Sequence, residues 1–172
     1  MNEIIRAPSI RLIAALLLTG LPGCSASQPS TAAPLAGARI GGPFILTDQN
    51  GRRVSDRDLG DRYRIYYFGY TFCPDVCPVD MQNISAALHL LDKSDPALAA
   101  RVVPVFITVD PERDTPAVLK EFTGAFDPRI IGLTGSPAEI RAVAANFAIF
   151  YQKEPPRPDG GYIVGHQRVA YL

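Results

Sequence analysis

Short apolar runs alternate with helical stripes of apolar residues through the chain after residue 64. Runs at 65–70, 102–109 and 130–133 are bounded by turn residues, which is typical of buried strands. After each of the first two runs, apolar residues recur at helical spacing: Met81, Ile84, Leu88 and Leu91, then Val118, Leu119, Phe122 and Phe126. The alternation of strand and helix predicts an α/β domain with parallel strand pairing.

The segments on either side extend this pattern. Apolar residues at 44–46, the turn residues Asp48-Gln49-Asn50-Gly51 and Val54 predict a short hairpin before the first long strand. Ser136-Pro137-Ala138-Glu139 is a capping box with proline at the first helical position, and it predicts a helix to about Phe147. Residues 152–161 are rich in Pro and Gly and predict a loop, which a final strand at 168–172 follows.

The N-terminal segment has the pattern of an export signal. Ten residues at 12–21 are apolar or small and follow Arg6 and Arg11, whereas a membrane-spanning helix needs about 20 apolar residues. Leu21, Gly23 and Cys24 resemble a bacterial lipoprotein box, in which the cysteine receives lipid. We expect residues 1–24 to form this signal and lipoprotein anchor, with an uncleaved apolar anchor as the alternative. Both place the domain on the periplasmic side of the bacterial cell envelope.

Composition indicates one folded domain and argues against a nucleic-acid partner. Residues 25–38 are rich in Ser, Ala and Pro and predict a flexible tether, which leaves 39–172 as the folded domain. A chain of 172 residues with 47% hydrophobic residues has room for one well-buried domain. Seventeen basic residues balance 17 acidic ones and no basic run occurs, so we expect no nucleic-acid partner.

Two thiols four residues apart, Cys73 and Cys77, lie between the first long strand and the helix after it. The unpaired N–H groups and the dipole at a helix N-terminus stabilise thiolates, so we expect both sulfurs to be reactive and to suit soft metals. The alternatives are an inert disulfide and two buried small side chains. Because the expected compartment is oxidising, this redox-active pair needs reduction before it can bind a metal.

Only two histidines, His89 and His166, can supply imidazole chemistry. His89 lies on the polar side of its predicted helix, which favours a surface role. His166 follows a Gly-containing segment, where a loop could direct it toward a distant site. Its 89-residue separation from Cys77 leaves open whether the two side chains meet.

The chain from about Ile40 to Leu172 resembles the Sco family (Sco/SenC) of copper-binding assembly proteins, which have a thioredoxin-like fold. The segments that carry the resemblance are the hairpin turn 48–51, Tyr67-Phe68-Gly69-Tyr70-Thr71-Phe72-Cys73-Pro74-Asp75-Val76-Cys77-Pro78, Asp110-Pro111-Glu112-Arg113-Asp114-Thr115-Pro116 and Tyr162-Ile163-Val164-x-His166. The resemblance implies a central mixed sheet with flanking helices. It also implies that Cys73, Cys77 and His166 converge on one copper ion, Cu(I) or Cu(II).

The same resemblance implies the partners. It implies a membrane-tethered chaperone that delivers copper to the binuclear copper site of cytochrome c oxidase, or reduces the cysteines of that site. The expected partners are therefore the copper-site subunit of the oxidase, another periplasmic copper carrier and a thiol reductant. Two thiolates and one imidazole are a soft ligand set that suits copper, whereas structural zinc takes a fourth ligand.

The chain departs from the family pattern at two places. The family has Asp before its histidine and Ser or Thr after it, whereas Gly165 and Gln167 flank His166, so the carboxylate that would orient the imidazole is missing. The family also continues with one more strand and a terminal helix, which are missing here. We expect the edge at 168–172 to be bare and the domain to be prone to aggregation.

An alternative function is that of an enzyme, a thiol–disulfide reductase or peroxidase of thioredoxin-like fold. Disulfide oxidoreductases of this fold have two residues between their cysteines, whereas three separate Cys73 from Cys77, which favours the chaperone. Asp110, Arg113 and Asp114 follow the second long strand, at the edge of the sheet where such folds place their sites. They are candidates for supporting the site or docking a partner, or for capping the helix that begins at Pro116.

Overall fold

The computed structural model describes residues 37–158 and 160–172. The predicted signal at 1–24, including Cys24, and most of the predicted tether lie outside these residues. Within the described residues, no helix has the length and apolar character needed to cross a membrane. The elements are β1 (Ile45–Asp48), β2 (Arg53–Ser55), the 3₁₀ helix η1 (Asp56–Leu59), β3 (Tyr63–Gly69), α1 (Val76–Ser94), α2 (Pro96–Ala99), β4 (Val102–Thr108), α3 (Pro116–Gly124), β5 (Ile131–Thr134), α4 (Pro137–Asn146), β6 (Tyr151–Lys153), β7 (Val164–His166) and β8 (Ala170–Tyr171).

A six-stranded mixed sheet forms the centre of the domain, in the order β2-β1-β5-β4-β3-β8. The three strands predicted from apolar runs, β3, β4 and β5, pair in parallel, as the alternation of strand and helix predicted. The predicted hairpin β1–β2 extends the sheet through antiparallel pairing of β1 with β5. Strand β8 pairs antiparallel with β3 and lies within the stretch 168–172 that was predicted as the final strand.

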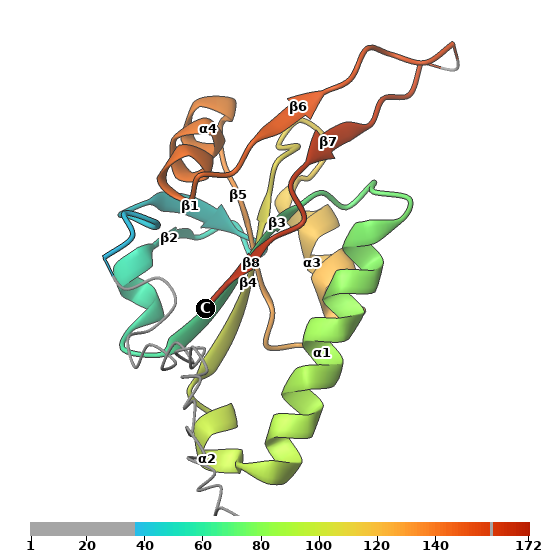
Figure 1. Cartoon of the computed structure of the whole chain (residues 1–172). Helices are drawn as coiled ribbons and strands as arrows, with labels where there is room; N and C mark the ends of the chain where they lie inside the picture. The colour runs from blue at the N-terminus through green and yellow to red at the C-terminus, as the bar shows by residue number, and fades with distance from the viewer. Residues whose placement is uncertain (1–36, 159) are drawn as a thin grey trace, which may run out of the picture. The chain divides into compact units, whose positions relative to one another are not determined.

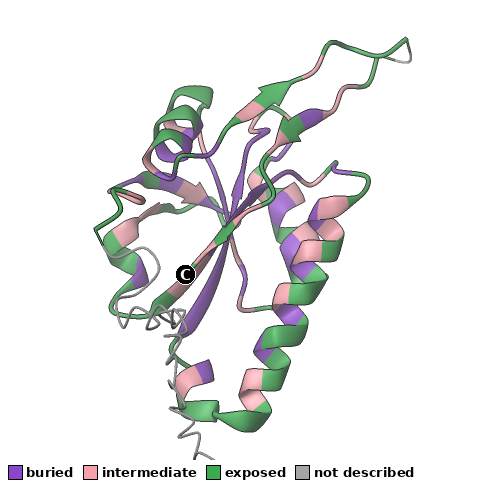
Figure 2. Cartoon of the chain, viewed as in Figure 1, coloured by how far each residue is buried: buried purple, intermediate pink, exposed green. Residues whose placement is uncertain are grey.

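Helices cover both faces of the sheet, with α1 and α3 on one side and α4 on the other (Figure 1). Every residue of β4 is buried, as expected for a central strand covered on both faces. Burial is concentrated in the sheet and in the inner sides of the helices (Figure 2). The Cα of Gly132 on β5 lies under α3, where a Cβ would come within 3.2 Å of Leu119.

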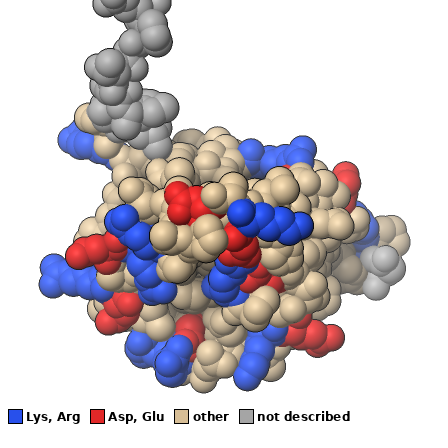
Figure 3. Space-filling view, turned by 90° about the horizontal axis from the view of Figure 1, so that it is seen from below, with Lys and Arg blue, Asp and Glu red and all other residues tan. Residues whose placement is uncertain are grey.

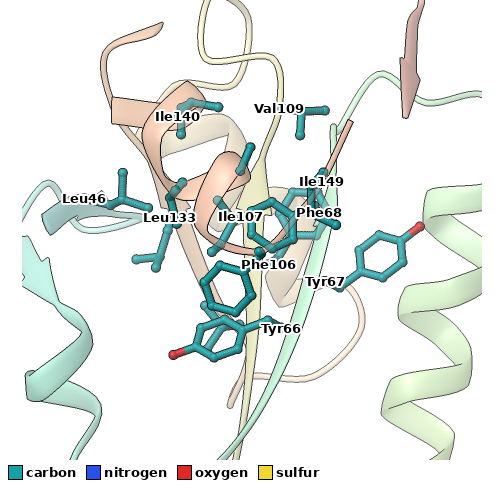
Figure 4. Close-up of a cluster of buried hydrophobic side chains, with 14 of the residues drawn as sticks. Leu46, Tyr66, Tyr67, Phe68, Phe106, Ile107, Val109, Leu133, Ile140 and Ile149 are labelled. Atoms are coloured by element: carbon teal, nitrogen blue, oxygen red, sulfur yellow. The ribbon is translucent and has the colours of Figure 1, made fainter. Parts of the chain in front are cut away.

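Aromatic side chains fill the layers between sheet and helices. Tyr66 and Phe68 of β3 pack against Phe147, which follows α4, with ring centroids 4.7 and 5.3 Å apart. Because successive side chains of a strand point to opposite faces, Tyr67 lies on the α1 side, where its ring is 6.1 Å from that of Phe106. Figure 4 shows Tyr66, Tyr67, Phe68 and Phe106 in the core cluster. The face seen in Figure 3 carries basic and acidic side chains in alternation, and neither sign gathers into a patch there.

Two helices begin as their sequences require. Ser136 caps α4, and the reciprocal bond from its backbone N–H to Glu139 completes the predicted capping box. Thr115 caps α3 by accepting a hydrogen bond from the N–H of Val118. Thr115 therefore caps α3, the alternative role that was considered for Asp110, Arg113 and Asp114.

The prediction of an unpaired loop at 152–161 is wrong at its first two residues. Gln152 and Lys153 belong to β6, which pairs antiparallel with β7 in a second, two-stranded sheet. The resulting hairpin extends beyond the end of the main sheet (Figure 1). His166 is the last residue of β7 and pairs with Tyr151, so a strand rather than a free loop carries the imidazole.

Candidate metal centre

The two thiols lie at the junction between β3 and α1. Cys73 is in the connecting loop and Cys77 is in the first turn of the helix, and both are buried and free of disulfide bonds. Asp75, the N-cap of α1, makes no side-chain capping bond. The N–H of Cys77 points instead to Cys73 Sγ, 3.5 Å away, so the first sulfur lies at the helix N-terminus as predicted.

Gly69, the last residue of β3, makes room for the second sulfur. A Cβ at this position would lie 2.8 Å from Cys77 Sγ and 2.8 Å from the Tyr67 ring, closer than real side chains come. The absence of a side chain at Gly69 therefore lets α1 sit against the strand with Cys77 between them.

The expectation that both sulfurs are activated is wrong for Cys77. Its side chain is inaccessible to solvent, and burial raises the pKa of its thiol to about 12. Burial removes the hydration of the thiolate, and in the metal-free protein this cost exceeds what the helix N-terminus contributes. Cys77 is therefore a thiol until another cation replaces its proton.

His166 reaches the same point from the hairpin. Its Nε2 lies 3.3 Å from Cys77 Sγ, and its Nδ1 lies 3.0 Å from the backbone oxygen of Gln167. Because a carbonyl oxygen only accepts hydrogen bonds, Nδ1 carries the proton and Nε2 presents its lone pair to the sulfur. The imidazole lies edge-on to the rings of Tyr67 and Tyr70, with centroids 6.5 and 5.8 Å away.

Together, Cys73, Cys77 and His166 form a group whose three ligand atoms all lie within 4.8 Å of one another. In the part of the chain that the structure describes, no other three His, Cys, Asp or Glu side chains form such a group. Two sulfurs and one imidazole nitrogen are soft or borderline donors, and a set of three suits copper better than structural zinc. The donor atoms thus fit the ion that the sequence predicted.

His89 takes no part in this group. Its side chain is 60% exposed, and its Nε2 lies 3.5 Å from a carboxylate oxygen of Asp127. The predicted surface position is confirmed.

Asp114 supports the loop that carries the first cysteine. Its buried carboxylate accepts hydrogen bonds from the N–H and the hydroxyl of Thr71, at 3.0 and 2.7 Å. Thr108 at the end of β4 donates a third bond, at 2.6 Å. Burial raises the pKa of this carboxyl although the three donors lower it. Asp114 therefore fastens the start of the cysteine loop to the central strand.

Arg113 and Asp110 connect that loop to the hairpin. The Arg113 guanidinium donates to the Asp110 carboxylate at 2.5 Å and to the backbone oxygen of Tyr162 at 3.0 Å. It also stacks on the ring of Tyr162 at 3.6 Å and lies 4.9 Å from the ring of Phe72. Tyr162 returns a hydrogen bond to Asp110. Asp110, Arg113 and Asp114, which were predicted to support the site or dock a partner, contact the cysteine loop and the hairpin and are not part of the three-ligand group.

Three neighbours of the group were not found from the sequence: Tyr67, Asp80 and Arg168. The Tyr67 hydroxyl donates to Asp80 at 2.9 Å, and Arg168 makes a two-pronged contact with the same carboxylate. One signal was available, since Asp80 lies three residues after Cys77 and therefore on the same face of α1. Arg168 and Tyr67 carried no signal of this kind.

Comparison with known proteins places these features in a family. The family model described as SCO1/SenC matches residues 32–172. The mitochondrial SCO1 homolog 1 of Arabidopsis thaliana is 46% identical over 140 residues, which cover 81% of this chain and 41% of the relative. The chain therefore spans about two fifths of the length of that relative.

Solved structures agree with the sequence comparison. ScoI of Arabidopsis thaliana with copper bound superposes with a TM-score of 0.72 at 44% identity, over 77% of this chain and 80% of that one. ScoI of Bradyrhizobium japonicum with copper bound gives a TM-score of 0.70 at 45% identity, over 77% and 81%. These matches confirm the predicted α/β class and thioredoxin-like fold. The family model, the relative and both structures show that the chain belongs to the SCO1/SenC family.

Proposed function

We propose that this protein is a copper chaperone that binds one copper ion through Cys73, Cys77 and His166. The observation that carries the proposal is the convergence of these three ligand atoms within 4.8 Å of one another. The two related proteins whose structures contain copper support copper as the cargo. Copper binding releases the proton that burial holds on Cys77, so the apparent affinity rises with pH.

The three ligands have different roles in this proposal. Cu(I) is satisfied by two thiolates, so Cys73 and Cys77 hold it, whereas Cu(II) also recruits the His166 imidazole. Three protein ligands leave one side of the ion open to an incoming ligand of a partner. Phe72, which is 53% exposed, precedes Cys73 in the chain and is the apolar residue that we expect a partner to contact.

The recipient in this proposal is the binuclear copper site of cytochrome c oxidase, in accordance with the family resemblance. Delivery includes reduction of the cysteines of that site. The Cys73 thiolate attacks the disulfide of the partner and releases one of its sulfurs as a thiolate. Cys77 then attacks the Cys73 sulfur of the mixed disulfide and gives up its proton to the second partner sulfur, which leaves as a thiol. The products are a Cys73–Cys77 disulfide and a reduced partner. Two electrons pass to the partner, so a separate thiol reductant restores the pair before another copper carrier reloads it.

Copper titration of the reduced protein tests this function. We expect one equivalent bound by the wild type, loss of tight binding in Cys73→Ser and Cys77→Ser, and in His166→Ala a larger loss for Cu(II) than for Cu(I). His89→Ala is the matched control and should bind as the wild type does. A disulfide-oxidised wild type should bind neither ion tightly. Full binding by both cysteine variants would overturn the proposal, and rapid catalytic reduction of insulin without copper binding would favour the thiol–disulfide reductase.

The envelope location is a separate part of the proposal. We propose that lipid on Cys24 tethers the domain to the membrane on the periplasmic side, with an uncleaved apolar anchor as the other possibility. Membrane fractionation of Cys24→Ser separates the two, because a lipid anchor depends on that sulfur. Release of the variant or failure to process it supports lipidation, whereas unchanged processing and retention support the apolar anchor.

A further inference from the structure

An ion pair joins the helix that carries Cys77 to the segment that carries His166. Arg168 Nε lies 2.9 and 2.7 Å from the two oxygens of Asp80, and its Nη2 lies 2.5 Å from Oδ1. The Asp80 side chain is only 14% exposed and also accepts the Tyr67 hydroxyl at 2.9 Å. A planar guanidinium that holds a mostly buried carboxylate with two nitrogens fixes orientation as well as distance.

The position of this pair relative to the ligands gives it a function. Asp80 lies one helical turn after Cys77, and Arg168 lies two residues after His166. The pair therefore holds the backbone around His166 against α1, where the second sulfur sits. The Tyr67 ring lies edge-on to the imidazole, and its hydroxyl donates a hydrogen bond to the same Asp80 carboxylate. Asp80 therefore fixes both Arg168 and the aromatic ring that contacts His166.

Besides the 3.3 Å contact of its Nε2 with Cys77 Sγ and the edge-on contacts with Tyr67 and Tyr70, the imidazole has one hydrogen-bond partner among the contacts that the structure describes. Its Nδ1 bonds to the oxygen of Gln167, the neighbouring residue, which moves with it. Gly165 precedes it and brings no carboxylate. Two hydrogen bonds to Phe150 hold Gln167. The N–H of Gln167 donates to the oxygen of Phe150, and its side-chain oxygen accepts the Phe150 N–H. These bonds tie Gln167 only to Phe150, the residue that precedes β6 in the same hairpin.

We propose that Asp80 and Arg168 are positioning residues, which keep His166 Nε2 in place to ligate the copper ion held by Cys77. The proposal rests on the proposed function, because it assigns the pair a role in forming the third ligand bond. A half-exposed arginine contributes little to overall stability, so its loss affects the ligand more than the fold. Asp80 and Arg168 touch neither the ion nor the thiols.

The first test needs no metal. The chain has two histidines, so an imidazole NMR spectrum of the reduced protein contains two sets of ring-proton signals, and exposed His89 is an internal reference. In the wild type, we expect cross-relaxation from His166 to the Tyr70 ring, whose centroid is 5.8 Å away. Arg168→Met and Asp80→Asn should each weaken these cross-peaks and leave the His89 signal unchanged. Unchanged His166 cross-peaks in both variants would overturn the proposal.

The second test uses Cu(II) and Cu(I) salts as probes. Loss of a side chain that orients a metal ligand costs about 10- to 100-fold in affinity, so Arg168→Met should bind Cu(II) at least 10-fold more weakly. Its Cu(I) affinity should change less than 3-fold, because two thiolates suffice. Arg168→Lys keeps the positive charge but not the two-nitrogen contact of the guanidinium, so it should bind Cu(II) more tightly than Arg168→Met and more weakly than the wild type. Arg53→Met, which breaks the Arg53–Glu139 pair at the other end of the sheet, is the matched control.

The outcomes separate this proposal from the proposed function. A wild type that binds no copper ends the chaperone proposal, while the NMR result still decides whether the pair positions His166. A wild type that binds copper, together with an Arg168→Met variant that matches it in Cu(II) affinity and spectrum, ends the positioning proposal alone. In a double-mutant cycle, equal losses in Arg168→Met, Asp80→Asn and the double variant support one shared contact, and additive losses contradict it.

Discussion

At the scale of single residues, Cys77 combines a high proton affinity with a position suited to the proposed metal site. Burial raises the pKa of its thiol to about 12, which protects the sulfur from solution oxidants in the metal-free protein. A soft cation at the same place removes the cost of burying a bare thiolate. The sulfur is therefore reserved for metal and for its neighbour Cys73, the outer of the two.

Gly69→Ala tests how tightly Cys77 is placed. The added methyl would lie 2.8 Å from both Cys77 Sγ and the Tyr67 ring, so α1 or the ring must move. We expect a loss of about 1–3 kcal/mol in the free energy of unfolding, measured with urea, and a lower copper affinity. Gly124→Ala is the control, because no atom lies within 4 Å of its added Cβ and a helical alanine is favoured. Equal stability and copper affinity in the two variants would contradict the close approach.

Arg113→Met tests the connection between hairpin and cysteine loop. Removing the guanidinium leaves the buried Asp110 carboxylate with only the Tyr162 hydroxyl from this network. We expect a loss of about 2 kcal/mol in unfolding free energy and faster amide exchange in β6 and β7. Lys153→Met, which removes the exposed pair with Glu112 and the contact of the ammonium with the Tyr162 ring, should cost much less than Arg113→Met. Exchange in the hairpin that does not respond to Arg113→Met would argue against this connection.

At the scale of elements, the start of α4 is sensitive to acid. Hydrogen bonds from Arg53 and from the Ser136 N–H and hydroxyl lower the pKa of Glu139 to about 2, from its ordinary 4.5. A carboxyl whose folded pKa lies below its unfolded value binds fewer protons when folded. Its contribution to stability is therefore complete above pH 4.5 and is lost as the pH falls toward 2.

Glu139→Gln should remove this dependence. With a side chain that is 34% exposed, solvent screening limits the contribution to about 1 kcal/mol at neutral pH. The stability difference between wild type and variant, from chemical denaturation at a series of pH values, should shrink between pH 4.5 and 2. A difference that stays constant across this window would contradict the assigned pKa.

The β6–β7 hairpin carries His166, the third ligand of the proposed copper site. A two-stranded hairpin is marginal by itself, so its position depends on contacts with the rest of the domain. Arg113 holds it through Tyr162 before β7, and the Asp80–Arg168 pair holds the chain after β7. The imidazole thus lies between two attachments, both of which join the hairpin to elements that carry or support a cysteine.

At the scale of the whole molecule, the two faces of the sheet have separate functions. The face covered by α4 is packed with aromatic rings around Phe147, whereas the face covered by α1 contains the cysteines. Stability and copper binding should therefore be separable by substitution.

Phe147→Leu is the corresponding prediction. It removes ring contacts with Tyr66 and Phe68 and should lower the unfolding free energy by about 1–2 kcal/mol. The copper affinity of the folded protein should match that of the wild type, because Phe147 lies on the face opposite Cys77. Matched urea denaturation and copper titration measure both quantities. A copper affinity that falls along with stability would show that the two faces are coupled.

The order and type of the main elements follow from the sequence alone. Alternation of apolar runs with helical stripes is a local property, and so are the capping box at Ser136 and the turn before Arg52. The soft ligand types were also visible, because Cys73 and Cys77 lie close together at a strand–helix junction. The short strand β6 was missed, since three residues bordering a proline-rich segment carry too little periodicity to predict pairing.

Only the tertiary structure decided which distant residues meet and which environment each one has. The contact between His166 and Cys77 spans 89 residues and depends on the pairing of β7 with β6 and of β8 with β3. The raised pKa of Cys77 depends on how completely the sheet and α1 exclude water from its sulfur. Local sequence sets backbone preference and chemical type, whereas proximity, burial and charge pairing are properties of the packed chain, because they arise from segments that touch only after it folds.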